Sequence, residues 1–207
     1  AVKSSPKVGS LGLYALTSEL AHLEQLLALG VDTIQWRGKD PTADFTAQTR
    51  TAMQLCRDAN TRFIINDYWQ LAIELGADGV HLGQEDCVTA DWQAIRNAGL
   101  ITGISTHTEW EIAHARGYQP SYIAFGPVYK PLSKTLRYPP LGCEQIAVWQ
   151  QRYGSERALT CIGGITGDQV ADVAATGIPS IAIVTALLPG PMQVEQYCVM
   201  RQHYPRP

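Results

Sequence analysis

The chain has 207 residues, of which 45% are hydrophobic and 17% are charged, and its formal net charge is −3. This length and balance are typical of a globular protein with one domain or at most two. The sequence has no run of about 20 apolar residues that could span a bilayer, and its charge excludes the broad basic surface of nucleic-acid-binding proteins. We therefore expect neither a membrane nor a nucleic acid as a partner, and any bound anion has to be met by a few local cations.

The cysteines indicate a reducing compartment. The five thiols are scattered, odd in number and form no C-x-x-C pair, and no signal peptide is recognisable. We expect free thiols and a cytoplasmic protein.

The first ten residues are small, polar and basic. This composition predicts a flexible N-terminal arm over 1–10, followed by a single domain over 11–207.

Eight short apolar segments recur along the chain at intervals of about 20 to 25 residues in most cases, as parallel strands joined by helices do. Between them, residues such as Leu20, Leu23 and Leu27 share one helical face before Gly30 ends the segment. The pattern predicts alternating strands and helices, with strands at 13–17, 33–37, 62–66, 79–82, 101–105, 122–125, 159–163 and 180–184.

Eight such units form either an open doubly wound sheet or a closed barrel. Polar residues follow several successive strands, among them Gln35, Asn66, Asp86 and Ser105. Groups from so many strand ends converge only if the strands form a ring, whose C-terminal face is the usual active-site location. The sequence therefore predicts an α/β fold of the single (β/α)8 TIM-barrel type.

Three polar residues alternate along the chain at the end of the second strand. Gln35, Arg37 and Lys39 are expected to project in a similar direction, so that two cations would face a polyphosphate. The alternative is an Arg and a Lys that merely cover the barrel rim.

Two aspartates follow the third and fourth strands. Asp67 and Asp86 could share a hard, oxygen-seeking ion such as Mg²⁺, or each could cap a helix. His81 has no second histidine or cysteine at ligand spacing, so we expect a hydrogen-bonded residue of the barrel wall instead of a zinc ligand.

Two further regions suit anions. The stretch 126–142 is rich in proline and carries Ser133, Lys134 and Arg137, which favours a lid that grips an anion. Gly163-Gly164 and the Val184-Thr185 pair follow the seventh and eighth strands, where barrels often bind phosphate through backbone N–H groups, although Gly-Gly also forms plain turns.

Together these segments resemble the thiamine-phosphate synthase family. The match runs in order along nearly the whole chain, and the run Val-His-Leu-Gly-Gln-Glu-Asp at 80–86 is its most specific part. The other matching segments are 35–40, 65–67, 103–107, 122–128 and 162–165.

The resemblance implies a barrel enzyme that joins hydroxymethylpyrimidine pyrophosphate to a thiazole phosphate through a dissociative step and releases pyrophosphate. It also implies roles for individual residues. The catalytic set would be Arg37, Lys39, Lys134 and Ser105. The pyrimidine pyrophosphate would be held by Gln35, Arg37, Lys39, Asn66, Ser105 and Lys134, the thiazole phosphate by Gly164, Val184 and Thr185, and Mg²⁺ by Asp67 and Asp86.

The chain departs from the family pattern at two places. Pro131 stands where the family usually has the first hydroxyl of the long loop, whereas Ser133 keeps the second. Thr185 stands where the family usually has serine, which preserves the hydroxyl. We include Pro131 and Ser133 among the expected substrate-binding positions.

Two other functions remain alternatives. A thiazole tautomerase is a related barrel that needs no pyrophosphate site, and a non-catalytic phosphate-binding barrel would act as a regulator. Arg37, Lys39, Asp67 and Asp86 together favour the synthase. The sequence leaves self-association into a homo-oligomer open.

Overall fold

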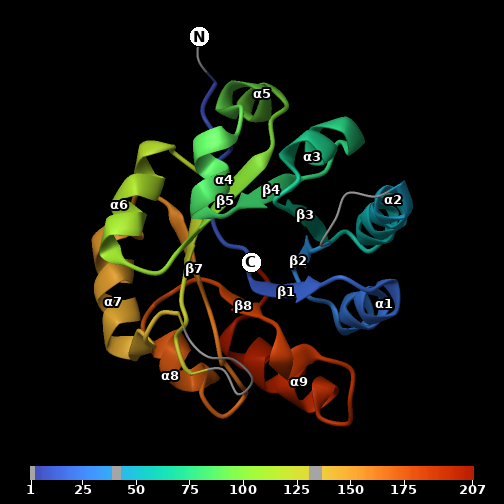
Figure 1. Ribbon diagram of the computed structural model, residues 1–207. Helices are drawn as coiled ribbons and strands as arrows, with labels where there is room; N and C mark the ends of the chain where they lie inside the picture. Colours follow the sequence, from blue (N-terminus) through green and yellow to red (C-terminus); the bar gives the residue numbers. More distant parts are fainter. Residues whose placement is uncertain (1–2, 39–42, 131–136) are drawn as a thin grey trace.

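The computed structural model describes residues 3–38, 43–130 and 137–207. Its eight strands are parallel and close into a barrel in chain order, as Figure 1 shows. Four predicted strands have the same bounds in the structure, and the other four differ by one residue at one or both ends. The strands are β1 (Leu13–Thr17), β2 (Thr33–Trp36), β3 (Arg62–Asn66), β4 (Gly79–Leu82), β5 (Ile101–Thr106), β6 (Tyr122–Phe125), β7 (Ala158–Ile162) and β8 (Ile181–Ile183).

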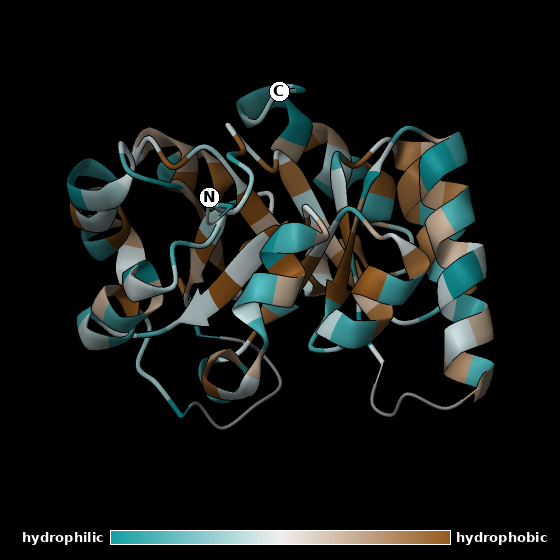
Figure 2. Cartoon of the chain, turned by 90° about the horizontal axis from the view of Figure 1, so that it is seen from above, coloured by the Kyte–Doolittle hydropathy of each residue, from teal (hydrophilic) through white to brown (hydrophobic). Residues whose placement is uncertain are grey.

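The helices form a ring around the strands (Figure 1). Their apolar faces turn toward the strands and their polar faces toward solvent, which Figure 2 shows as alternating brown and teal on each helix. The single (β/α)8 barrel expected from the sequence is confirmed. The helices are α1 (Leu20–Leu29), α2 (Ala43–Asp58), α3 (Trp69–Leu75), α4 (Gln84–Thr89), α5 (Trp92–Asn97), α6 (Glu109–Gly117), α7 (Gly142–Tyr153), α8 (Val170–Ala175), the 3-10 helix η1 (Thr185–Leu187) and α9 (Gln193–His203).

Two hydrophobic layers stabilise the barrel. The larger layer lies between strands and helices and includes the fully buried Trp36 and Phe63. The smaller layer fills the barrel interior and consists of Leu11, Tyr14, Leu16, Ile64, Tyr122, Ala124 and Ala182. Two tyrosines therefore lie inside the barrel, where their hydroxyls need hydrogen-bond partners.

Part of the predicted N-terminal arm contacts the barrel. Ser5 is 6% exposed and its Oγ accepts a hydrogen bond of 3.0 Å from Thr102 Oγ1. Val8 packs against the interior layer, and the carbonyl of Ser10 accepts a hydrogen bond from Arg62. These contacts place this segment against the barrel, and the flexibility of residues 1–10 stays a prediction.

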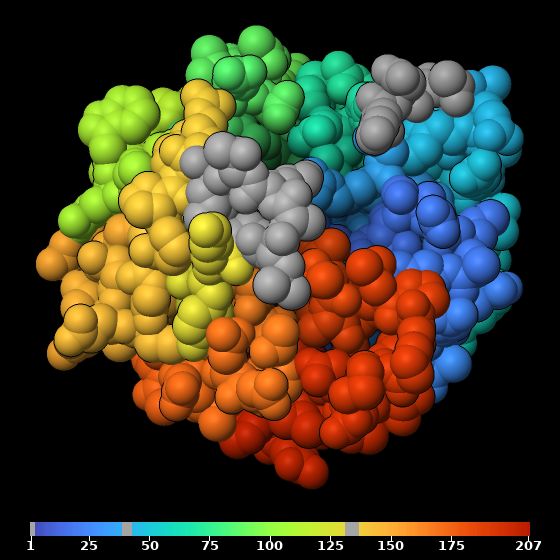
Figure 3. All heavy atoms as spheres, turned by 60° about the horizontal axis from the view of Figure 1, so that its bottom comes forward, coloured from blue at the N-terminus to red at the C-terminus, as the bar shows by residue number. Residues whose placement is uncertain are grey.

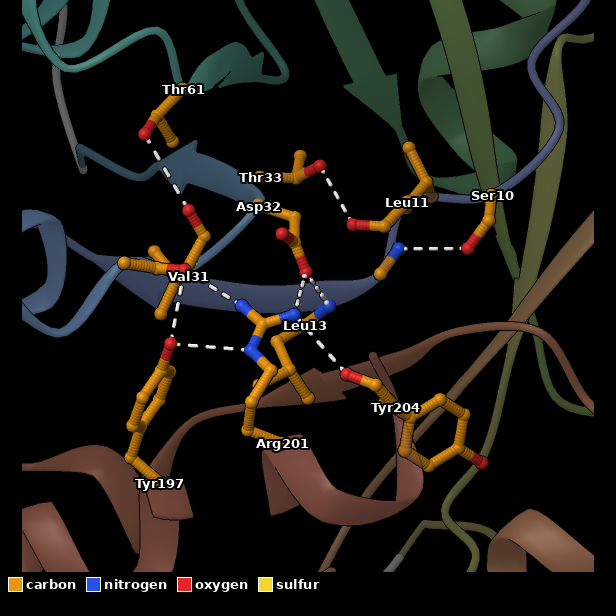
Figure 4. Close-up of polar contacts among 12 residues, drawn as sticks. Ser10, Leu11, Leu13, Val31, Asp32, Thr33, Thr61, Tyr197, Arg201 and Tyr204 are labelled. Atoms are coloured by element: carbon orange, nitrogen blue, oxygen red, sulfur yellow. Dashed lines mark hydrogen bonds and ion pairs between the residues drawn. The ribbon is translucent and has the colours of Figure 1, made fainter. Parts of the chain in front are cut away.

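An ion pair ties the last helix to the first two strands (Figure 4). Asp32 Oδ2 accepts from the backbone N–H of Leu13 and from Arg201 Nη1, each at 2.8 Å. Arg201 also donates to the carbonyl oxygens of Gly30 and Tyr204. The two charged side chains are only 17% and 11% exposed, so water screens them little.

Among the described residues, no helix combines the length and the apolar character needed to cross a membrane.

We expect Arg201→Ala to lower the free energy of unfolding by about 2–3 kcal/mol, because it leaves the Asp32 carboxylate and two carbonyls without a charged donor. Arg50→Ala is the control, since Arg50 and its partner Glu74 are 57% and 63% exposed and should contribute less than about 1 kcal/mol. Urea denaturation of both variants measures the difference. Equal losses would show that the ion pair does not secure α9.

Gly103 makes room for the Tyr122 ring inside the barrel. A Cβ at this position would overlap ring atoms of Tyr122, which is fully buried. Gly103→Ala should therefore cost about 1–3 kcal/mol through overpacking. Gly117→Ala, where a Cβ would meet no atom within 4 Å, is the matched control and should be close to neutral. Thermal unfolding followed by circular dichroism gives both values, and an unchanged Gly103→Ala melting temperature would contradict the packing argument.

Candidate active site

A small cavity lies inside the C-terminal mouth of the barrel. Its volume is about 90 Å³, and all eight strands contribute to its wall. Four residues singled out from the sequence meet here, namely Gln35, Arg37, Asn66 and Ser105. They converge because each stands at or just beyond the end of a strand of the closed ring. The other lining residues are Tyr14, Leu16, His81, Ala124, Ile162 and Ala182.

A larger cavity of about 820 Å³ adjoins the small one, since Leu16, Arg37 and Asn66 line both. It lies between the segments that follow β1 and β8. Figure 3 shows the blue and red parts of the chain side by side on one face. Arg37 is exposed and stands at the junction of the two cavities. The larger cavity is lined further by Thr17, Ser18, Glu19, His22, Gly38, Phe45, Asp67, Val184, Leu188 and Pro189.

A row of hydrogen bonds runs along the wall of the small cavity. Gln35 Nε2 donates to the Tyr14 hydroxyl at 2.9 Å, and the hydroxyls of Tyr14 and Tyr122 are 2.7 Å apart. The Tyr122 hydroxyl is 2.8 Å from His81 Nδ1, and His81 Nε2 is 2.6 Å from Ser105 Oγ. We call these five residues the polar row. The prediction that His81 is a hydrogen-bonded residue of the barrel wall is confirmed.

Burial keeps the polar row uncharged. Desolvation, with a smaller contribution from the positive charge of Arg37, lowers the pKa of His81 to about 3. Desolvation also raises the pKa of Tyr14 to about 12 and the pKa of Tyr122 well above its usual value. The imidazole and both phenols are therefore neutral at pH 7.

Asp67 stands in a tight turn after β3. Its φ is +66°, and its N–H donates to the carbonyl of His81 at 2.8 Å. Such left-handed backbone is uncommon outside glycine, although aspartate tolerates it better than most residues. The turn directs residue 67 away from the line of the strand and into the wall of the larger cavity.

Asp86 lies beside Asp67. The two carboxyl groups are close enough for a side-chain hydrogen bond, and Asp86 Oδ2 accepts from the N–H of Gly83 at 3.2 Å. The pKa of Asp67 is raised, first by desolvation and then by the negative charge of Asp86, while Arg37 opposes the shift. Asp86 also forms a capping interaction at the start of α4, so the helix-capping alternative and the paired-carboxylate interpretation are both compatible with its position.

The glycine pair after β7 is required by backbone packing. Gly163 and Gly164 have φ values of +114° and +66°, and a Cβ on either would press on Pro127 or Tyr129. The N–H of Tyr129 donates to the carbonyl of Gly163 at 3.0 Å. A close turn against the segment after β6 thus accounts for both glycines, whether or not they also meet a phosphate.

The remaining candidates are placed less closely together. Val184 lines the larger cavity and Thr185 begins η1, and both are exposed. Among the described lining residues of the two cavities, Gly164 and Thr185 do not occur. Four predicted site residues, Lys39, Pro131, Ser133 and Lys134, lie outside the described residues.

The sequence interpretation missed Tyr14 and Tyr122, which stand in apolar strand segments and were counted with the hydrophobic core. It also missed the wall of the larger cavity from Thr17 to His22. The signal for the first two was a tyrosine within a fully buried strand, since such a hydroxyl requires a partner.

Comparisons with known proteins agree with this geometry. A family model described as thiamine monophosphate synthase matches residues 13–187. A thiamine-phosphate synthase of Photorhabdus laumondii is 45% identical over 184 residues, covering 88% of this chain and 85% of that protein. The corresponding protein of Proteus mirabilis is 42% identical with the same coverage.

A solved structure with a related name has the same fold. Thiamine phosphate pyrophosphorylase from Pyrococcus furiosus superposes with a TM-score of 0.80 at 26% identity, covering 93% of this chain and 95% of that one. Because the family model and the relatives span most of the barrel, including the strand ends that form both cavities, the chain belongs to the thiamine monophosphate synthase family and is a transferase.

Proposed function

We propose that this protein joins 4-amino-2-methyl-5-hydroxymethylpyrimidine pyrophosphate to 4-methyl-5-(2-hydroxyethyl)thiazole phosphate, or to its carboxylate form, giving thiamine phosphate and pyrophosphate. The observation that carries the proposal is the pair of adjoining cavities with Arg37 at their junction. Two ring substrates could meet there with a cation beside the bond that breaks. The names of the relatives support the same reaction.

The small cavity suits the pyrimidine ring. It is narrow, and Gln35 and Ser105 offer an amide and a hydroxyl while the aliphatic side chains of Leu16, Ile162 and Ala182 supply apolar wall. Such a mixture of apolar surface and a few fixed polar groups is typical of small-molecule sites. The pyrophosphate would then extend toward Arg37, with Lys39 and Lys134 as further expected cations.

Mg²⁺ fits the pair formed by Asp67 and Asp86. Asp67 lines the larger cavity with Asp86 beside it, and the pKa of Asp67 is raised first by desolvation and then by the negative charge of Asp86. Hard cations prefer such oxygen ligands, and Mg²⁺ commonly binds one or two carboxylates while substrate phosphates and water complete its shell. When bound, the ion would neutralise charge that develops on the departing pyrophosphate.

The remaining residues need supply no strong base. Pyrophosphate would leave with the bonding electrons, and the thiazole nitrogen would capture the pyrimidine-stabilised cation. Arg37 would stabilise the leaving group, and the cavity walls would hold the rings in line and keep water from the cation. The thiazole would occupy the larger cavity, with its phosphate near Gly164, Val184 and Thr185.

The decisive experiment supplies both substrates with and without Mg²⁺ and measures thiamine phosphate and pyrophosphate. The proposal requires one pyrophosphate per thiamine phosphate, formed only with the metal. A thiazole tautomerase would isomerise the thiazole carboxylate without the pyrimidine, and a regulatory barrel would bind one ligand with no turnover. The cytoplasmic location and the homo-oligomer remain predictions, to be checked by fractionation and light scattering.

Asp67→Ala and Asp86→Ala should each lower Mg²⁺-dependent turnover at least about 100-fold, because charge stabilisation by a bound metal amounts to several kcal/mol. Both variants should stay folded, since removing one of two like charges relieves repulsion. Asp58→Ala, which changes an exposed carboxylate at the end of α2, is the control. Near-normal activity in either site variant would remove that residue from the metal site.

Arg37→Ala should lower kcat by about 100- to 1000-fold, the loss typical of removing one charge-stabilising donor from a transition state. The KM for thiazole phosphate should change little, and Arg37→Lys should recover part of the rate because it keeps the charge. Steady-state kinetics with each substrate varied in turn would test this. A change confined to the thiazole KM would assign Arg37 to the other substrate.

A further inference from the structure

The polar row has a direction, which follows from its first hydrogen bond. The hydroxyl oxygen of Tyr14 accepts a hydrogen bond from Gln35 Nε2–H, and its other hydrogen-bond partner among the described residues is the Tyr122 hydroxyl. The Tyr14 proton is therefore directed to Tyr122. The Tyr122 oxygen accepts this hydrogen bond, so its own O–H donates to the next acceptor, which is His81 Nδ1.

A neutral imidazole that accepts at Nδ1 carries its proton at Nε2. His81 is 5% exposed, and both its ring nitrogens face neutral hydroxyls. Its Nε2–H thus donates to Ser105 Oγ, across a distance of 2.6 Å. The Ser105 oxygen then accepts this hydrogen bond, and its own proton, which His81 Nε2–H cannot accept, is left for the cavity that Ser105 lines.

At the other end, Gln35 commits one of its two amide N–H groups to the row, which fixes the orientation of the amide. Its carbonyl oxygen takes no part in the row, so the wall of the small cavity gains an acceptor at Gln35 and a donor at Ser105. The row therefore couples the hydrogen-bonding character of two residues on opposite sides of the mouth.

We propose that His81, Tyr122 and Tyr14 are positioning residues that select a 4-aminopyrimidine over a 4-oxopyrimidine by fixing Gln35 as acceptor and Ser105 as donor. This inference rests on the proposed function and specifies its ring selectivity. An aminopyrimidine brings an exocyclic amine that donates and ring nitrogens that accept, which complements the wall. The 4-oxo ring presents a carbonyl in place of the amine and an N–H in place of one ring nitrogen. Donors of the ring would then face donors of the cavity wall, and acceptors would face acceptors.

A variant that keeps the aromatic ring but removes its hydroxyl distinguishes a positioning role from a role in packing. Tyr122→Phe keeps the ring that stacks on His81, with the ring centroids 5.6 Å apart, but removes the O–H that donates a hydrogen bond to Nδ1. The imidazole is then free to take either tautomer, and Ser105 can act as donor or acceptor. Tyr204→Phe is the matched control, because Tyr204 is also a buried tyrosine and its hydroxyl has no hydrogen-bond partner among the described residues.

The experiment measures binding of two probes by calorimetry in metal-free buffer, without pyrophosphate. The probes are 4-amino-5-hydroxymethyl-2-methylpyrimidine and the compound in which a 4-oxo group replaces the amine. The unmodified protein should bind the amino probe at least about tenfold more tightly, as expected for one mismatched hydrogen-bond pair. Tyr122→Phe should lower this ratio about tenfold, Tyr14→Phe should lower it less, and Tyr204→Phe should leave it unchanged.

A second measurement needs no variant. Long-range ¹H–¹⁵N correlation spectra of the unmodified protein report the tautomer of His81, which should be protonated at Nε2. Protonation at Nδ1 would reverse the row and overturn the inference. Undiminished discrimination in Tyr122→Phe would also overturn it, and so would failure of the unmodified protein to bind the amino probe more tightly than the 4-oxo probe. The proposed function is decided separately, by turnover of the two substrates.

Discussion

The pairing of β8 with β1 holds the strand ends in a ring, and the arrangement of the site depends on that closure. Cα positions from Leu13 to Ala15 pair with those from Ile181 to Ile183, so the last strand lies beside the first. An open sheet of the same strands would spread its polar ends along an edge. In the ring, Gln35 and Ser105, contributed by β2 and β5, instead line one small cavity. The Asp32 and Arg201 pair reinforces the same seam from the side of α9.

A closed barrel with two tyrosines inside must also satisfy their hydroxyls. An unpaired buried polar group costs about 1–3 kcal/mol, whereas a complete network avoids that cost and specifies one arrangement of its members. The polar row satisfies Tyr14 and Tyr122 with each other, with Gln35 and with His81. The interior packing of the barrel and the chemistry of its mouth are thus parts of one network.

The sequence predicted the fold and part of the site for identifiable reasons. Strand positions were predictable because each strand is a compact apolar segment, and the meeting of Arg37, Asn66 and Ser105 followed once the strands were placed in a ring. The link from Tyr14 to Tyr122 was not predictable, since it joins residues 108 positions apart whose aromatic character had already assigned them to the core. The left-handed turn at Asp67 was also missed, because aspartate tolerates positive φ better than most residues but rarely adopts it, so a single aspartate does not predict such a turn.

Arg37 joins the two halves of the site electrostatically. Desolvation is the main cause of the lowered pKa of His81, and the positive charge of Arg37 adds to it. For Asp67, desolvation and the charge of Asp86 raise the pKa, whereas Arg37 lowers it. One guanidinium therefore favours the neutral imidazole in the wall of the small cavity and the ionised carboxylate in the wall of the larger one. Because both groups lie within reach of one charge, the small cavity and the carboxylate pair are coupled through Arg37, and substitutions in the two should not be additive.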